Sequence, residues 1–262
     1  MKTLIKNTKC INLKSGKGFT LLELVVVIVI LGVLATVAMR SFTAQEATRK
    51  FEETLREMDI LKKALVGDEE VIQDGYRVDF GYVGDMGGWP PDFDALRVDP
   101  GIAGRLNWNG PYVSVDFIDN EEDYKYDAYN QPYVVQQLDL NGDLDLETYI
   151  RSDGAATSII IADGETNIFN NTVRVFIRDR DGNVPTPGDE TNIHVTLSTQ
   201  NGDSYAGVVQ AGGICEFLNN IPIGNHIISV SHDLLPGETP TRPVSVDPGS
   251  NRLIEVIFLS LP

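Results

Sequence analysis

The pattern of apolar and polar residues divides the chain into a long N-terminal helix, a loop-rich middle and a strand-rich C-terminal third. Residues 19–39 are apolar almost throughout, and Glu23 is the only charged side chain among them. After this run, apolar residues recur at steps of three and four among charged ones, at Phe51, Leu55, Met58, Leu61 and Leu65. This spacing predicts one helix over 19–66 with an amphipathic second half, ended by Gly67 as its C-cap. The apolar run is long enough to cross a bilayer, which takes about 20 residues.

The middle block, residues 67–165, has short apolar runs between turns rich in proline, glycine and asparagine. This pattern indicates three or four short antiparallel strands, with candidates at 112–117, 131–138 and 146–151. We expect the apolar stripe of the helix to seat this small sheet. The aromatic residues of the block are then mainly packing residues, with carbohydrate stacking as the alternative; they are Trp89, Trp108, Tyr112, Tyr126, Tyr129 and Tyr133.

The C-terminal block, residues 172–262, has short runs rich in valine, isoleucine and threonine between turn signals. The expected strands are 172–178, 191–199, 204–209, 213–218, 225–232, 241–247 and 251–260. Strands at a spacing of roughly 8–12 residues predict a β-sandwich. Residues 164–171 form a linker or domain edge before it. The predicted fold class is therefore α+β, with a long N-terminal helix packed on a small antiparallel sheet and followed by an all-β sandwich.

Glu23 needs a partner or a use, because a carboxylate in a membrane helix costs about 3 kcal/mol at the helix centre and less near an end. A basic segment precedes the helix and includes Lys2, Lys6, Lys14 and Lys17. It should stay in the cytoplasm and orient the C-terminus outward. The basic segment and the apolar run could also form a plain membrane anchor or a secretory signal peptide. A secretory signal carries its small-residue cleavage site after the apolar core, whereas Gly18 comes before it.

The segment Lys17-Gly18-Phe19-Thr20-Leu21-Leu22-Glu23-Leu24 resembles the class III signal of type IV pilins and type II secretion pseudopilins. The resemblance implies that a prepilin peptidase removes residues 1–18 by cleaving after Gly18, and that the new amino terminus on Phe19 is methylated. It also implies that 19–39 spans the inner membrane before the helix enters a helical filament. In that filament Glu23 would pair with the Phe19 amine of a neighbouring subunit.

Two further resemblances concern the rest of the chain. The steps Gly110-Pro111-Tyr112, Asp127 to Tyr133 and Ser152-Asp153-Gly154-Ala155 resemble the major pseudopilin of type II secretion, which implies a pseudopilin head over 67–165. The C-terminal block resembles carboxypeptidase-regulatory-like and collagen-adhesin B-type domains in the segments Arg180 to Pro185, Ile193 to Leu197 and Ile221 to His226. That module is a scaffold with many uses. It has no lysine here, which excludes a Lys–Asn isopeptide bond.

Calcium is the one cofactor that the sequence suggests. Oxygen side chains recur at alternate positions in Asp139, Asn141, Asp143, Asp145 and Glu147. Calcium takes six to eight oxygen ligands, and such a loop could supply them. The same alternation fits a solvated acidic hairpin, so both interpretations stay open. The pseudopilin resemblance implies a second calcium candidate after the Ser-x-Gly-Ala step, at Asp153 and Asp163.

The net charge and the reactive side chains limit the classes of function that we consider. The net charge is −17, from 21 basic and 38 acidic residues, which argues against nucleic acid as a partner. Cys10 lies in the leader and Cys215 is then alone, so no intramolecular disulfide is expected after cleavage. Cys215 and the three histidines, His194, His226 and His232, are expected to be structural. No catalytic spacing is recognisable, and we expect no enzyme.

The sequence therefore predicts a structural subunit of a type II secretion pseudopilus or type IV pilus-like filament. Its expected partners are sibling pilins or pseudopilins, the prepilin peptidase, and the assembly platform and ATPase. The expected location is the inner membrane, then a periplasmic or surface filament. The alternative is a scarce tip subunit, or minor pilin, whose sandwich binds carbohydrate or protein as an adhesin or in cargo recognition.

Overall fold

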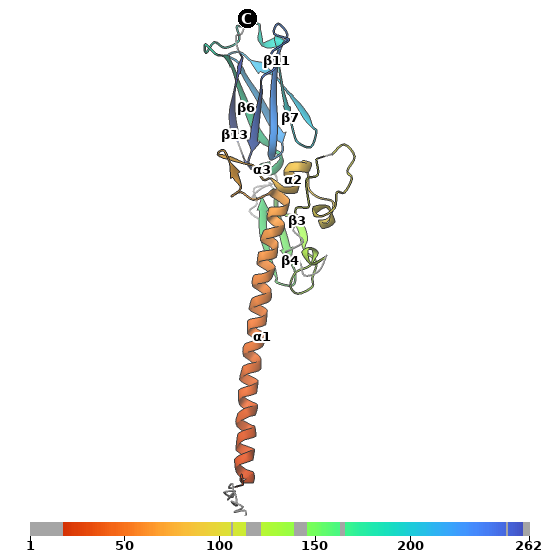
Figure 1. Cartoon of the computed structure of the whole chain (residues 1–262), viewed down its shortest axis with the longest axis vertical. Coiled ribbons are helices and arrows are strands. Elements are labelled where there is room, and N and C mark those ends of the chain that lie inside the picture. Colours follow the sequence, from red (N-terminus) through yellow and green to blue (C-terminus); the bar gives the residue numbers. More distant parts are fainter. Residues whose placement is uncertain are drawn as a thin grey trace, which may run out of the picture. The chain divides into compact units, whose positions relative to one another are not determined.

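The computed structural model describes residues 18–105, 107–113, 122–138, 146–162, 166–249 and 251–258. The chain forms two compact units, Met1–Arg49 and Lys50–Pro262. The first unit contains the N-terminal part of helix α1, and the second contains every described sheet (Figure 1). The α+β class predicted from the sequence, with a long N-terminal helix followed by antiparallel and mixed sheets, is confirmed.

Helix α1 runs from Leu21 to Val66 without interruption. It ends where the sequence predicted: Gly67 has a φ of +82° and donates its N–H to the carbonyl of Lys63 at 2.7 Å. Such a left-handed residue is the usual end of a helix, and glycine adopts it without a side-chain penalty. The predicted apolar stripe is buried at Met58, Leu61 and Leu65, whereas residues 21–39 are exposed along their whole length.

The head of the second unit is built on a three-stranded antiparallel sheet in the order β3-β4-β5. Its strands are Val134–Leu138, Glu147–Ser152 and Thr157–Ala162. Ile150 and Ile161 of this sheet join Met58, Leu61 and Leu65 of α1 in one hydrophobic core. The sheet therefore packs on the stripe of α1, as the period of three and four predicted.

Shorter elements complete the head. They are the hairpin strands β1 (Ile72–Gln73) and β2 (Tyr76–Arg77), helix α2 (Gly81–Met86), helix α3 (Thr166–Phe169), and the 3-10 helices η1 (Phe93–Leu96) and η3 (Asp123–Lys125). The predicted strand at 112–117 is wrong in its described part, because Tyr112 and Val113 belong to no strand. Tyr112 instead donates its backbone N–H to the Leu96 carbonyl and packs its ring edge-on against Trp108.

The C-terminal block forms two four-stranded sheets around a second core. One sheet has the order β13-β6-β10-β9 and the other β12-β11-β7-β8. The strands are β6 (Asn171–Asp179), β7 (Ile193–Ser198), β8 (Ser204–Gly207), β9 (Val209–Gln210), β10 (Ile214–Ile221), β11 (Gly224–His232), β12 (Thr241–Val246) and β13 (Asn251–Phe258). Strict alternation of buried and half-buried residues along β6 reflects one face on the core and one toward solvent.

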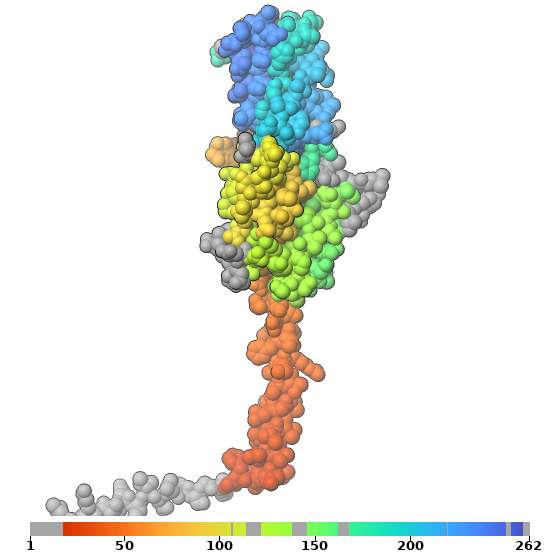
Figure 2. Space-filling model, turned by 90° about the vertical axis from the view of Figure 1, so that its right-hand side faces the viewer, coloured from red at the N-terminus to blue at the C-terminus, as the bar shows by residue number. Residues whose placement is uncertain are grey.

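The sandwich and the head share buried contacts within the second unit. Ile223, in the turn between β10 and β11, is fully buried in the core of the head, and its N–H donates to the Ile168 carbonyl at 2.8 Å. The buried Asn171 side chain, at the start of β6, donates to the carbonyl of Ile168 in α3 of the head at 3.3 Å. Ser245 Oγ donates to the Arg77 carbonyl at 2.9 Å. Figure 2 shows the two parts in direct contact, the head in yellow and green and the sandwich in cyan and blue.

Candidate functional site

The predicted processing site lies directly before helix α1. Gly18 and Phe19 are exposed, and the helix begins two residues later at Leu21. Thr20 caps this end, since its hydroxyl oxygen accepts the backbone N–H of Glu23 at 3.2 Å. The order Thr20-Leu21-Leu22-Glu23 is a capping-box sequence, a local signal for the start of a helix. Glu23 therefore lies in the first turn, where the helix dipole favours a negative charge.

The carboxylate of Glu23 has no hydrogen bond or ion pair among the described residues. It is exposed within a run of exposed apolar side chains that extends to Met39. By length and composition this part of α1 could span a membrane. A single acid on such a surface can accept a cation brought by another molecule when the apolar surface becomes covered.

The calcium candidates fall in two groups. Asp139, Asn141, Asp143, Asp145 and Asp163 lie outside the described residues. Glu147 is buried at the start of β4, and Asp153 uses its carboxylate to bind Arg151, with Oδ1 2.8 Å from Nε. In the described part of the chain, no group of three or more His, Cys, Asp or Glu side chains could hold a metal ion. Calcium binding therefore stays a prediction.

Asp127 is the residue that sequence reasoning undervalued. Its buried carboxylate accepts the N–H groups of Tyr129 and Gln131 through Oδ1, at 2.9 and 2.8 Å. Through Oδ2 it accepts the Ser152 hydroxyl at 2.5 Å and the Gly154 N–H at 3.1 Å. It thus fastens the turn after Tyr126 to the turn between β4 and β5. Both turns had been recognised as motifs, but nothing in their spacing along the chain predicts that one carboxylate joins them.

Two carboxylate–phenol pairs fix helix α1 and helix α2 to the head. Tyr133 donates its hydroxyl to Glu57 of α1 at 2.6 Å, and Tyr112 donates to Asp85 of α2 at 2.8 Å. Burial raises the pKa of both carboxyl groups and of both phenols. The members of each pair are hydrogen-bonded to one another inside the head, so both pairs stabilise the fold.

The cysteine and the histidines all lie in the sandwich. Cys215 is fully buried, and burial raises the pKa of its thiol to about 11, so it stays protonated at neutral pH. His232 is buried against Asp189, with Nε2 2.9 Å from Oδ2. His226 is buried with Nε2 2.8 Å from the Pro222 carbonyl oxygen. His194 binds Asp233 on the surface.

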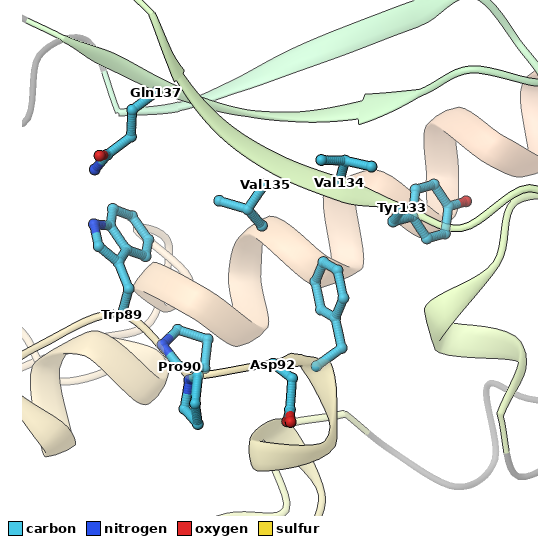
Figure 3. A pocket seen from close by; sticks show the side chains of 9 residues that line it. Trp89, Pro90, Asp92, Tyr133, Val134, Val135 and Gln137 are labelled. Carbon is cyan, nitrogen blue, oxygen red and sulfur yellow. The ribbon is translucent and has the colours of Figure 1, made fainter.

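A pocket of about 430 Å³ lies in the head between the segment Trp89 to Phe93 and strand β3. Figure 3 shows Trp89, Pro90 and Asp92 on one side and Val134, Val135 and Gln137 of β3 on the other. The indole of Trp89 also packs edge-on against Phe169. Its Nε1 is buried with no hydrogen-bond partner in the described structure. An aromatic and proline wall of this kind suits a small apolar group or one face of a sugar ring.

Comparison with known proteins bears on the N-terminal site. Residues 13–39 match the prokaryotic N-terminal methylation motif. The match includes Gly18, Phe19, Glu23 and the apolar run. The motif implies a type IV pilin-like protein that a prepilin peptidase processes and that assembles with other pilins; such proteins are generally structural and not enzymatic. The N-terminal apolar helix is consistent with anchoring in the inner membrane before assembly.

Two further comparisons concern the chain as a whole. No curated protein matches the chain. Among solved structures it is similar to the Bacillus anthracis TIE protein, with 12% sequence identity over 48% of this chain and 24% of that chain, and a TM-score of 0.28. The chain spans about a quarter of the length of that protein. A similarity this low supports no conclusion about fold or function.

Proposed function

We propose that the chain is a structural subunit of a type II secretion pseudopilus or a type IV pilus-like filament. A prepilin peptidase cleaves after Gly18 and the amine of Phe19 is methylated. The processed chain then leaves the inner membrane and polymerises through helix α1. One observation carries this proposal: the methylation motif coincides with a helix whose residues 21–39 are all exposed.

Polymerisation gives the exposed helix surface and Glu23 a single explanation. Packing of several α1 helices in a filament would bury the apolar side chains, which drives association at about 25 cal/mol per Å². The methylated amine on Phe19 stays cationic and would pair with the Glu23 carboxylate of a neighbouring subunit. In a bundle of low dielectric constant, that pairing would offset the cost of burying either charge alone.

The head and the sandwich would then be displayed outside the membrane, with sibling pilins or pseudopilins, the assembly platform and the ATPase as partners. The acidic character of the chain suits a solvated exterior. A second candidate is a scarce tip subunit whose sandwich recognises carbohydrate or protein. It is favoured by a C-terminal block as large as the head, with its own core. The copy number per filament would separate the two roles.

The test replaces Glu23 by valine in cells that make the filament. Glu23→Val should reduce incorporation about tenfold or more, because the amine of the neighbour would lose its counter-ion and 1.4 kcal/mol corresponds to a factor of ten. Thr36→Val is the matched control, since among the described residues the Thr36 hydroxyl bonds the Gly32 carbonyl of its own helix, at 2.8 Å. Incorporation is measured from sheared filaments by quantitative mass spectrometry.

The same spectra test the processing step. The mature protein should begin at Phe19 and carry one additional methyl group at its amino terminus. A mature protein that still begins at Met1, or Glu23→Val filaments with normal subunit content, would contradict the proposed function.

A further inference from the structure

The two sheets of the sandwich end in four edge strands, which are β13 and β9 in one sheet and β12 and β8 in the other. An edge strand exposes a row of unpaired N–H and C=O groups that another strand can bind. Natural proteins therefore blunt their edges with very short strands, proline, bulges or charged side chains, lysine above all. An edge without such protection in a stable protein is a candidate docking surface.

Three of these four edges are protected. β9 has two residues and β8 has four. β12 carries Pro243 within the strand, and proline has no N–H to offer. β13 differs, because its eight residues, Asn251–Phe258, include no proline or lysine, its Glu255 is paired with Arg178, and its pairing with β6 continues without a bulge. Among the described strands, β13 pairs with β6 alone.

A groove of about 610 Å³ lies beside this unprotected edge; we call it the β13 groove. Residues of β11, β12 and β13 and of the β1–β2 hairpin line it, all within the second unit. Its lining includes Tyr76, Val78, Arg242, Pro243, Leu253 and Ile257. Leu253 is 66% exposed and Tyr76 is 53% exposed. Large apolar side chains exposed together beside a groove mark an interaction site.

The charged groups of the β13 groove point to the chemistry of its ligand. Glu255 of β13 forms an ion pair with Arg178 of the neighbouring strand β6, so its charge is already matched. Arg242 of β12 forms no close ion pair among the described residues, but the pKa of Glu255 is lowered mainly by the Arg178 hydrogen bond and also by the charge of Arg242. A ligand with one acidic residue would bind the Arg242 guanidinium directly, whereas Asp74 and Glu255 in the same lining disfavour a strongly acidic ligand.

We propose that β13 binds an extended segment of a partner polypeptide by β-strand addition. The row of backbone groups on β13 requires a ligand in β conformation, and the exposed apolar side chains favour apolar residues at alternate positions of that ligand. Arg242 pairs with one acidic residue of the segment. This inference goes beyond filament assembly, because it gives the displayed sandwich a binding site and a class of ligand.

The test uses a phage-displayed library of random dodecapeptides against the full chain in detergent micelles. Selected peptides should show apolar residues at alternate positions and an acidic residue. Leu253→Asp should weaken their binding about tenfold or more, since it places a charge on the apolar surface without disturbing a buried residue. Leu218→Asp is the matched control, because Leu218 is exposed on β10 of the same sheet. It should bind the selected peptides as the unaltered chain does.

Hydrogen exchange then separates strand addition from simple apolar contact. A bound peptide should slow the amides of Asn251–Phe258 about tenfold or more, and the same peptide with N-methylated backbone amides should not bind. The proposal is overturned if no selected peptide depends on Leu253, or if protection falls outside β13. It is also overturned if β13 becomes protected at rising protein concentration without peptide, because the occupant is then a second copy. None of these results depends on Glu23. A failure of peptide binding is therefore distinguishable from a failure of filament assembly.

Discussion

At the scale of single residues, the most consequential side chains are carboxylates, and they act in opposite ways. Asp127 is buried with four hydrogen-bond donors around it, all from the head. Glu23 is exposed, and its carboxylate has no partner among the described residues. The hydrogen bonds of Asp127 are complete within the fold, so this residue contributes to stability. The charge of Glu23 has no partner among the described residues, so we assign this residue to assembly.

Asp127 gives a prediction about stability. Asp127→Asn keeps the shape but turns an amide NH₂ toward donors, so the free energy of unfolding should fall by roughly 3 kcal/mol. The close approach of Gly154, where a Cβ would lie 2.5 Å from Asp127 Oδ2, leaves no room to relax. Urea denaturation of the full chain in detergent measures the change. Asp153→Asn is the control on the exposed Arg151 pair and should cost about 0.5 kcal/mol or less. Equal effects of the two substitutions would contradict this role.

At the scale of elements, sequence periodicity predicted most of the fold. The helix and the strands of the sandwich follow apolar spacings of 3.6 and 2, which persist wherever one face is buried. Helix α2 was not predicted, because its six residues are too few to show a period. The β1–β2 hairpin had a usable signal in Asp74-Gly75 between apolar residues. The same holds for the candidate sites. Gly18, Phe19 and Glu23 form a local motif that the sequence shows. The contacts of Asp127 and the β13 groove join segments far apart in the chain, so the sequence does not show them.

Helix α1 gives a prediction that compares its two halves. Met58→Ala should lower the free energy of unfolding of the head by about 2–5 kcal/mol, because Met58 is fully buried in the core and its loss leaves a cavity. Met39→Ala, on the exposed apolar run, should change it by about 0.5 kcal/mol or less. Met39→Ala should nevertheless reduce incorporation into filaments, by more than its small effect on the free energy of unfolding explains. Urea denaturation and filament yield are measured for both variants. Equal losses in the free energy of unfolding would contradict the assignment of one half of α1 to folding and the other to assembly.

At the scale of the whole molecule, the second unit combines two cores that are joined by buried contacts. Ile223 places a residue of the sandwich in the core of the head, and the Asn171 side chain ties the start of β6 to the Ile168 carbonyl of α3. A load applied to the head would therefore reach the sandwich through packed side chains and backbone hydrogen bonds. This arrangement suits a module that a filament presents at a fixed position, and it places the β13 groove beside the head.

The junction between head and sandwich also contains a titratable group, and it leads to a prediction about pH. His226 is buried, and a Cβ on Gly224, two residues before it, would lie 3.0 Å from the carbonyl oxygen of Gly84 in α2. Protonation of the ring would place a charge in the interior of the protein, away from water. Burial accordingly lowers the pKa of His226 below its ordinary value of 6.5, against weaker opposing contributions from its backbone hydrogen bonds.

The sign of the effect follows from proton uptake. Below about pH 6.5 the unfolded chain binds a proton at His226 that the folded chain does not bind. The stability due to the neutral ring is therefore complete above that pH and is lost as the pH falls toward the folded pKa, by at most about 1.4 kcal/mol per pH unit. Glu57 and Asp85, whose pKa values are raised by burial, act in the opposite direction at lower pH. His226→Gln keeps a donor for the Pro222 carbonyl and does not titrate, so comparison with the unaltered chain isolates His226. Urea denaturation across this range should show a steeper loss in the unaltered chain and in the exposed control His194→Gln than in His226→Gln, and parallel curves for all three would exclude the effect.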